Sequence, residues 1–464
     1  MQFSKADYEN HKLMGSISTQ FLKYLEANPE LAQPMDAGQD QFDKEMGTYL
    51  YPIQPWPLLM EGDVLAEIRK QVACVPDLVK AIPERLFGNN GKKLAEFFDQ
   101  EDLGFTELLQ SSHAGLDNAF GRLDLYLTEG GFKVLETNFS ALVGGWQCFF
   151  SQQRQANTPL MRGFRESHPF KVTMRNVMQD GLVYAITQAM THPAIIGNRL
   201  NFAFLIDIPL DATVMRYCNH IMEQVLKARG SHLKGRVVLC PYDKIRIKNG
   251  YLKYRNIRIH AMMVLSSKPM PRAIVRSVVD GKVAVFNTPI SNVLGDKRCL
   301  ALLSQNQESD LFSAQERAQI KAYIPWTREL KPGKTEYQGG SFSIPEDLYR
   351  QRESWVLKKG NSLGGRDVYI GNALSKEEWL AAVEKATKEG GWIVQEFQKP
   401  KDLIFFNNLS KKPEPHKIAW GVFFFGPNYG GTWLRTMPSQ SNAQIINSAK
   451  GASETSAWEC QSQS

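Results

Sequence analysis

The 464-residue sequence predicts an α+β fold, and three features of the chain support this prediction. Apolar residues recur at helical spacing in the first hundred positions, whereas residues 121–138 alternate between polar and apolar on both sides of a glycine turn. Residues 201–243 follow a strand-helix-strand order. We therefore expect antiparallel hairpins and a parallel crossover unit, with helices packed on several sheets.

Composition is that of an ordinary globular protein. Hydrophobic residues make up 43% of the chain and charged residues 22%, which argues against long disordered tracts. No apolar run approaches the roughly 20 residues that a membrane helix needs, and the N-terminus lacks the pattern of a secretory signal. We therefore expect a cytoplasmic protein that does not bind membranes.

Charge and cysteine usage exclude several classes of protein. The net charge of +7 comes from scattered Lys and Arg residues, which favours a polyphosphate ligand over nucleic acid. The cysteines lie far apart, with no C-x-x-C pair and no histidine at zinc-ligand spacing, so reduced thiols are expected and no local signature supports a catalytic Cys-His pair. The six are Cys74, Cys148, Cys218, Cys240, Cys299 and Cys460.

Four regions are predicted along the chain: 1–110, 111–195, 196–295 and 296–464. The first is a helical N-terminal cap, with helices over residues 15–27 and 63–72 separated by a segment that contains Pro52, Pro55 and Pro57. The second contains the hairpin at 121–138. The cap carries few groups suited to chemistry, so a functional site is expected in the later regions.

The third region is predicted to be an α/β subdomain. Residues 201–209 and 235–243 resemble buried strands on either side of a helix at 212–229, which implies a parallel pair with a right-handed crossover. Asn249-Gly250 then marks a tight hairpin. Its interleaved Lys, Arg and Tyr residues fit either a nucleic-acid patch or a half-exposed hairpin with a charged outer face, and the second interpretation is favoured.

The last region alternates strands with a loop and a helix. The helix is predicted over residues 375–389. The predicted strands are 354–360, 368–371, 392–398, 418–426 and 430–437. This order is typical of an α+β nucleotide-binding domain.

Four polar side chains are predicted to meet on the hairpin at 121–138. Arg122 and Asp124 are two residues apart on one strand, as are Glu136 and Asn138 on the next, so each pair lies on one face of its strand. Pairing about the glycine turn brings positions 124 and 136 within roughly 5 Å, where two carboxylates repel each other unless a cation lies between them. Oxygen-only ligands are those that Mg²⁺ prefers, which makes Asp124, Glu136 and Asn138 the candidate metal ligands and leaves Arg122 to hold an anion. A solvated surface hairpin is the alternative.

A glycine loop follows the strand at 354–360. Gly360, Gly364 and Gly365 allow backbone N–H groups to approach phosphate oxygens, and Lys358 at the strand end adds a positive charge. The spacing is not that of a P-loop, and an ordinary turn is the alternative interpretation.

Further candidate groups lie downstream. Gln395, Glu396 and Phe397 end a short apolar strand, where backbone amides and an aromatic ring can hold an adenine edge. Arg435 adds another cation, and Asn447 adds another oxygen ligand. Each of these motifs alone is weak evidence for a nucleotide site. Their combination and their order along the chain are stronger evidence than any single motif.

Taken together, five segments resemble the circularly permuted ATP-grasp enzymes related to glutathionylspermidine synthetase. They are GRLDLYLTEGGFKVLETN, NTPISNVLGDKRCLALLS, WVLKKGNSLGGRDVYIG, WIVQEF and GGTWLR. The resemblance spans roughly residues 110–451, and the hairpin is its most specific part. It implies a circularly permuted ATP-grasp fold, with a pre-ATP-grasp subdomain over 196–295, and with core and ATP-binding lid over 111–195 and 296–464.

The resemblance also implies roles for individual residues. Asp124, Glu136 and Asn138 would hold Mg²⁺, and Arg122 would contact the carboxyl or acyl-phosphate group. The remaining assignments are Lys297 and Lys358 to the ATP phosphates, Gly364 and Gly365 to the phosphate loop, Gln395 and Glu396 to the adenine hinge, and Arg435 to the transition state.

In that family ATP phosphorylates a carboxylate, and an amine then displaces phosphate to give an amide. The resemblance therefore implies an ADP-forming, ATP- and Mg²⁺-dependent carboxylate-amine ligase that acts through an acyl phosphate on small-molecule or peptide acids and amines. A homodimer is compatible with this assignment. Two alternatives stay open, namely an ATP-dependent phosphotransferase that stops at the phosphorylated acid and an inactive nucleotide-binding protein of the same fold.

Overall fold

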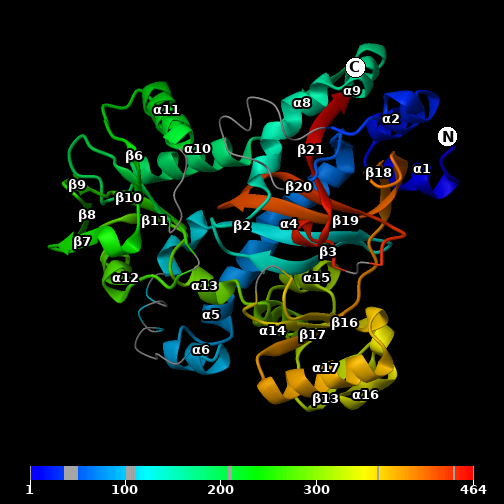
Figure 1. The fold of residues 1–464 in the computed structure, drawn as a ribbon. Helices are drawn as coiled ribbons and strands as arrows, with labels where there is room; N and C mark the ends of the chain where they lie inside the picture. The colour runs from blue at the N-terminus through cyan, green and yellow to red at the C-terminus, as the bar shows by residue number, and fades with distance from the viewer. Residues whose placement is uncertain are drawn as a thin grey trace.

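The computed structural model describes residues 2–35, 51–100, 106, 108, 111, 113–206, 212–266, 268–362, 365–442 and 445–462. Within these ranges the chain is a mixed α/β protein with several sheets, as the sequence predicts. Figure 1 shows a parallel sheet at the left in green, the largest sheet at the centre, and a smaller antiparallel sheet with α17 below in yellow and orange. No helix in the described ranges is both long enough and apolar enough to cross a lipid bilayer.

The largest sheet has eight strands in the order β1-β21-β20-β19-β2-β3, with β18 paired to β19 and β4 to β21. The expected hairpin is confirmed as β2-β3, and the expected strands 418–426 and 430–437 are confirmed as parts of β19 and β20. The strands are β1 (Leu58–Met60), β2 (Phe120–Thr128), β3 (Gly131–Asn138), β4 (Phe170–Thr173), β18 (Asp402–Asn407), β19 (Lys412–Phe425), β20 (Asn428–Pro438) and β21 (Ser453–Ser462).

One face of this sheet is covered by helix α4 (Gly62–Lys80), which packs against β19 and β20 and shares the main hydrophobic core with Leu123 and Leu125 of β2. Period-two alternation then points Arg122 and Asp124 to the opposite face. The prediction of a helix at 63–72 is thus too short. The helix continues through Pro76 because the buried stripe continues, and this burial offsets the hydrogen bond that proline cannot donate.

Residues 1–110, which are predicted to form a helical N-terminal cap, also contain a strand. Strand β1 from this region pairs in parallel with β21, so the N-terminal region contributes to the largest sheet. A three-residue strand without alternation gives no sequence signal, since all of its side chains are buried. The helices here are α1 (Lys5–Lys12), α2 (Ser16–Ala27), α4, α5 (Ile82–Arg85) and α6 (Gly91–Phe97), and α8 (Gln152–Asn157) and α9 (Pro159–Ser167) follow the hairpin.

The predicted strand-helix-strand unit is confirmed as a four-stranded parallel sheet in the order β11-β10-β5-β6. The hairpin at Asn249-Gly250 is also confirmed, with both residues in the left-handed region that a tight turn requires. The elements are α10 (Val177–Met190), β5 (Phe202–Ile206), α11 (Ala212–Ala228), β6 (Val237–Cys240), β7 (Ile245–Lys248), β8 (Tyr251–Tyr254), β9 (Ile257–Arg258), β10 (Ala261–Leu265), α12 (Arg272–Val279) and β11 (Ala284–Phe286).

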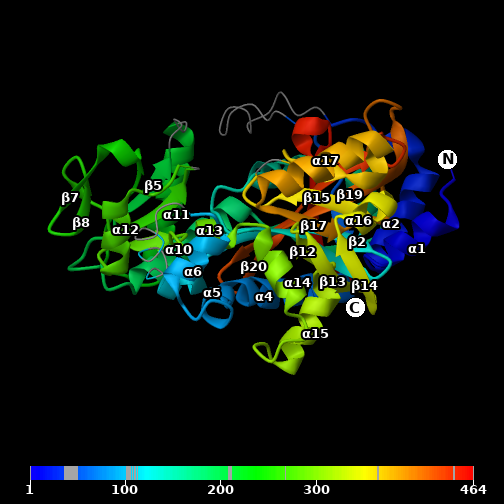
Figure 2. The ribbon, with the colours of Figure 1, turned by 90° about the horizontal axis from the view of Figure 1, so that it is seen from below.

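A third sheet, here called the lid sheet, has four antiparallel strands in the order β12-β17-β15-β16. Helix α17 (Lys376–Glu389) packs on it through a core that includes Trp355, Trp379 and Trp392, and Figure 2 shows the helix lying along these strands. The strands are β12 (Thr327–Glu329), β15 (Trp355–Lys359), β16 (Val368–Ile370) and β17 (Trp392–Glu396). Nearby elements are α13 (Ser291–Leu294), α14 (Arg298–Gln305), α15 (Ala314–Tyr323), the hairpin β13 (Gly333–Tyr337) and β14 (Gly340–Ile344), and α16 (Glu346–Arg350).

Candidate functional site

A cavity of about 670 Å³ lies between the lid sheet and the face of the largest sheet that carries Arg122 and Asp124. Strands β2, β3, β19 and β20 contribute one wall, and β15, β16, β17 and the residues that follow β17 contribute the other. Gly360 of the glycine loop does not line it, Gly364 lies outside the described ranges, and the other candidate residues do line it. The lining candidates are Arg122, Asp124, Glu136, Asn138, Lys297, Lys358, Gly365, Gln395, Glu396, Phe397, Arg435 and Asn447.

The hairpin brings its polar residues together by simple strand pairing. Asp124 lies directly opposite Glu136, and Arg122 lies opposite Asn138. Between Asp124 and Leu125 a bulge shifts the pairing register of β2 with β3. All four polar residues nevertheless line the cavity. The sequence-based expectation that positions 124 and 136 are neighbours is therefore confirmed.

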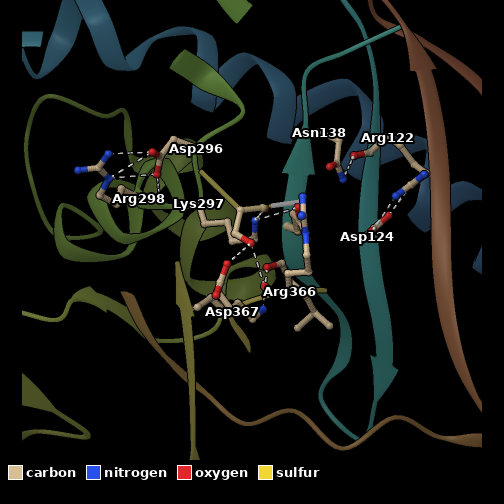
Figure 3. A network of polar contacts seen from close by, with 12 residues as sticks. Arg122, Asp124, Asn138, Asp296, Lys297, Arg298, Arg366 and Asp367 are labelled. Atoms are coloured by element: carbon tan, nitrogen blue, oxygen red, sulfur yellow. Dashed lines mark hydrogen bonds and ion pairs between the residues drawn. The ribbon is translucent and has the colours of Figure 1, made fainter. Parts of the chain in front are cut away.

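Asp124 is held by two guanidinium groups (Figure 3 shows the first). Arg122 donates to both carboxylate oxygens, from Nε at 2.6 Å and from Nη2 at 3.1 Å, and Nη2 of Arg435 lies 3.1 Å from Oδ2. Burial raises the pKa of Asp124, but the two arginines outweigh burial and bring the pKa to about 2. This carboxylate is therefore charged, and the cluster of one anion and two cations has a net positive charge.

Trp433 and two glycines set the shape of this cluster. The guanidinium carbons of Arg122 and Arg435 lie 4.9 and 4.7 Å from the Trp433 ring centroid, so the ring supports both side chains. Gly421 on β19 lies under Arg122, and a Cβ there would be 2.9 Å from Arg122 Cδ. A Cβ on Gly145 would be 2.2 Å from the Trp433 ring. Both glycines are therefore required for the close approach of these side chains.

The second carboxylate has a different cation. Nζ of Lys297 lies 3.2 Å from Oε1 of Glu136 and donates to the carbonyl of Ser362 at 2.6 Å, which connects the hairpin to the glycine loop. Lys297 precedes α14 and lies between the buried Asp296 and Arg298, which form an ion pair at 2.9 Å (Figure 3). Backbone and side chain of Lys297 are thus both fixed, since its N–H also donates to Gly360.

Lys358 reaches the same region from β15. Its Nζ donates to the carbonyl of Leu135 at 3.1 Å and to Oε1 of Gln395 at 2.6 Å. Burial, with help from the charge of Lys297, lowers the pKa of Lys358 to about 8, although Glu136 acts in the opposite direction. Burial makes the charged form of Lys358 less favourable, and a nearby anion stabilises that form. The site therefore favours an anionic ligand beside Lys358.

Positive charge dominates the cavity wall. Its basic side chains are Arg122, Lys297, Lys358, Arg366, Lys399, Lys417 and Arg435, and its acidic side chains are Asp124, Glu136, Glu396 and Asp402. Nε of Arg435 is buried and donates no hydrogen bond to any residue in the described ranges. A ligand with several negative charges would accept a hydrogen bond from Nε of Arg435 and would balance the excess positive charge of the cavity wall.

The predicted adenine segment has internal hydrogen bonds. Besides accepting from Lys358, the Gln395 side chain donates to Thr327 Oγ1 at 3.1 Å, so it orients the lysine. The backbone N–H groups of Glu396 and Phe397 donate within the lid region, and Tyr337 donates to the Glu396 carboxylate at 2.7 Å. This segment therefore lines the cavity with the backbone N–H groups of Glu396 and Phe397 already paired to protein carbonyls.

The candidate metal ligands are two carboxylates and one amide, which suit a hard cation by donor type. Among the residues that the structure describes, no group of three or more His, Cys, Asp or Glu side chains is placed to hold a metal. The repulsion expected between Asp124 and Glu136 is removed by Arg122, Arg435 and Lys297 instead. Of the two acids, Glu136 has the more exposed side chain, 25% against 14% for Asp124, and the longer ion pair.

Sequence reasoning missed Trp433 and Gly421. Trp433 precedes Arg435 by two positions in a strand, which places both on one face. Gly421 interrupts the apolar run of β19, and a glycine inside a strand often marks a close approach. These signals were present, but neither indicates a role without knowledge of the neighbouring strand.

Comparisons with known proteins support the fold. No protein-family model matches the sequence, and neither does any curated protein. A glutathione synthetase-like effector from Globodera pallida, solved in its apo form, has a similar structure with a TM-score of 0.51 and 11% identity, over 94% of this chain and 96% of that one. A candidate gamma-glutamylcysteine synthetase from Methylobacillus flagellatus gives a TM-score of 0.37 and 11% identity, over 79% of this chain and 88% of that one, which is too weak to carry an argument.

The chain therefore has a fold related to that of a synthetase-like protein over nearly its whole length. At this level the predicted resemblance is supported. Its finer parts, namely the glutathionylspermidine synthetase relatives, the circular permutation and the subdomain boundaries, remain predictions.

Proposed function

We propose that this chain is an ADP-forming, ATP-dependent carboxylate-amine ligase with a circularly permuted ATP-grasp fold. One observation carries the proposal: a single cavity gathers two arginines around Asp124 and two lysines around Glu136 from four distant segments of the chain. Such a set suits the transfer of a phosphoryl group, where positioning and charge stabilisation supply most of the catalysis.

The two clusters suggest a division of labour. Lys297 and Lys358 lie beside the glycine loop and would contact the ATP phosphates. Arg122 and Arg435 would hold the acid substrate and, later, the acyl phosphate, since an arginine fork matches carboxylate and phosphate oxygens. Three of the five N–H donors of Arg122 are used in the structure, which leaves two for a ligand.

The proposed reaction balances without further reactants. A carboxylate oxygen attacks the γ-phosphorus of ATP and ADP leaves. The amine nitrogen then attacks the acyl carbon, phosphate leaves, and the amine proton passes to solvent. Glu136, Asn138 and Asp124 would hold magnesium, which supplies positive charge next to the phosphate oxygens.

Product analysis tests this proposal. The full chain with ATP, Mg²⁺ and a panel of acids and amines should release ADP and phosphate only when both an acid and an amine are present. ADP with phosphate retained on the acid would show a phosphotransferase, and the absence of ADP across the panel would favour a nucleotide-binding protein.

A matched pair of variants tests the site. Glu136→Gln should lower ADP release by at least about a hundredfold, which corresponds to roughly 2.7 kcal/mol of transition-state stabilisation. Glu129→Gln, which removes an exposed acid of the same hairpin that also pairs with a lysine, should leave the rate unchanged. Equal rates for the two variants would refute the assignment of Glu136.

A further inference from the structure

A second cavity, of about 320 Å³, lies between the parallel sheet and the largest sheet. Phe120 of β2 and Phe423 and Phe425 of β19 form one side, and Phe204 of β5 and Met263 of β10 form another. No charged side chain of the described residues lines it. This apolar cavity therefore differs in chemistry from the basic cavity described above.

The apolar cavity lies at a preferred position for ligands in parallel sheets. The chain passes from β5 to β6 on one side and later returns to place β10 on the other side of β5. In open α/β sheets, ligands bind outside the carboxyl ends of the strands at such a switch point. Ile206 and Leu265, the last residues of β5 and β10, both line the cavity.

The two cavities are neighbours on one face of the largest sheet. Phe120 lines the apolar cavity, Arg122 and Asp124 line the basic one, and successive residues on a face are spaced by roughly 7 Å. Gly144 lines the apolar cavity while its carbonyl accepts a hydrogen bond of 3.0 Å from Arg122 Nη1. Arg122 therefore forms the boundary between them.

The rim carries an exposed apolar side chain. Leu142, in the segment that follows β3, is 48% exposed and lines the apolar cavity. Ser140 and Gln147 are the polar side chains among the lining residues, and the rest of the lining is aromatic, aliphatic, methionine or glycine. A ligand group here would be desolvated by contacts with apolar atoms.

We infer that the acid substrate has an apolar body, which fills this second cavity while its carboxylate lies at Arg122. The inference rests on the proposed ligase function and narrows its substrate to carboxylic acids with an aliphatic or aromatic body. A cavity of this size is at the small end of ligand sites, which span roughly 300–1,000 Å³, so it suits one side group and not a whole peptide.

Binding of straight-chain carboxylates tests the inference. Propanoate, butanoate, pentanoate and hexanoate would be titrated into the full chain by calorimetry, with the matching alcohols as probes that lack the charge. Each added CH₂ group should tighten binding about fourfold until the cavity is full. The alcohols should bind at least about tenfold more weakly than the acids.

Three variants locate the binding. Ala141→Trp fills the apolar cavity and should abolish the dependence on chain length, and Leu142→Asn should weaken hexanoate several-fold. Leu13→Asn is the control, since Leu13 is equally exposed, at 47% against 48%, and does not line the cavity. Circular dichroism and thermal unfolding would show that Ala141→Trp remains folded.

Two results would overturn the inference: affinities that do not rise with chain length, or a chain-length dependence that survives Ala141→Trp in a folded protein. Failure of the ligase proposal would look different. Hexanoate would then bind with the expected profile, but no ADP would appear with any amine.

Discussion

Replacing Asp124 by asparagine should destabilise the protein measurably, because the carboxylate neutralises two buried guanidinium groups. Arg122 and Arg435 are each 8% exposed, and both contact this acid. The pKa of Asp124 is lowered from 3.8 to about 2. Since one pKa unit corresponds to about 1.4 kcal/mol and asparagine resembles the protonated acid, Asp124→Asn should lower the free energy of unfolding by about 2 to 3 kcal/mol.

The pH dependence of stability gives a second measure of the same pair. The lowered pKa means that the charged acid stabilises the folded state above pH 4, and that this contribution is lost as the pH falls from about 4 towards 2. Urea unfolding followed by tryptophan fluorescence and circular dichroism would measure both effects. The Asp124→Asn variant should lack this part of the acid-induced loss.

The matched control is Glu129→Gln on the same hairpin. Glu129 pairs with Lys401 at 2.6 Å, the same distance as Arg122 Nε to Asp124, but its side chain is 92% exposed. Solvent screens such a pair, so this substitution should change stability little. The double variant Asp124→Asn, Arg435→Met should recover part of the lost stability by removing one unpaired cation. Equal stability changes for Asp124→Asn and Glu129→Gln would refute the reasoning.

Three further predictions follow from the geometry. Because the pKa of Lys358 is lowered to about 8, calorimetry should show ATP affinity falling about tenfold as the pH rises from 7 to 9, and Lys358→Met should remove this dependence. Burial raises the pKa of Glu454 to about 8, so the folded state keeps a proton that the unfolded state loses near pH 4.5. Stability should therefore fall as the pH rises from about 4.5 to 8, and thermal unfolding of Glu454→Gln should lack this fall. Gly421→Ala places a methyl group 2.9 Å from Arg122 Cδ and should slow ADP release at least about tenfold without loss of helix or strand content. Gly130→Ala, whose added methyl group meets nothing closer than 3.8 Å, should have the wild-type rate.

The hairpin at the centre of the site was predictable because its signals are local. Alternation sets which face each residue occupies, and the glycine turn sets which residues lie opposite one another. Asp124 and Glu136 could therefore be paired from sequence. The basic side chains that pair with these acids could not be predicted, since Arg435 comes from β20 and Lys297 precedes α14, and their approach depends on how separate elements pack.

The role of Gln395 shows the same limit. Its position at the end of an apolar strand was correct, and the residue does line the cavity. The direction of its side chain depends on the pairing of β17 with β15, which brings Gln395 near Lys358. Pairing partners that are far apart in sequence leave no periodic signal, so the hydrogen bond between Lys358 and Gln395 could not be predicted.

Strand β21 is the last strand of the largest sheet to be synthesised. It is inserted between β1 and β20, and Thr455 on it donates to the carbonyl of Trp56, 399 positions earlier. During translation every other strand of the largest sheet leaves the ribosome before β21 does. Until then β20, which carries Arg435, has an unpaired edge that is open to other chains. Nascent chains that stop before β21 should therefore be prone to aggregation and depend on chaperones.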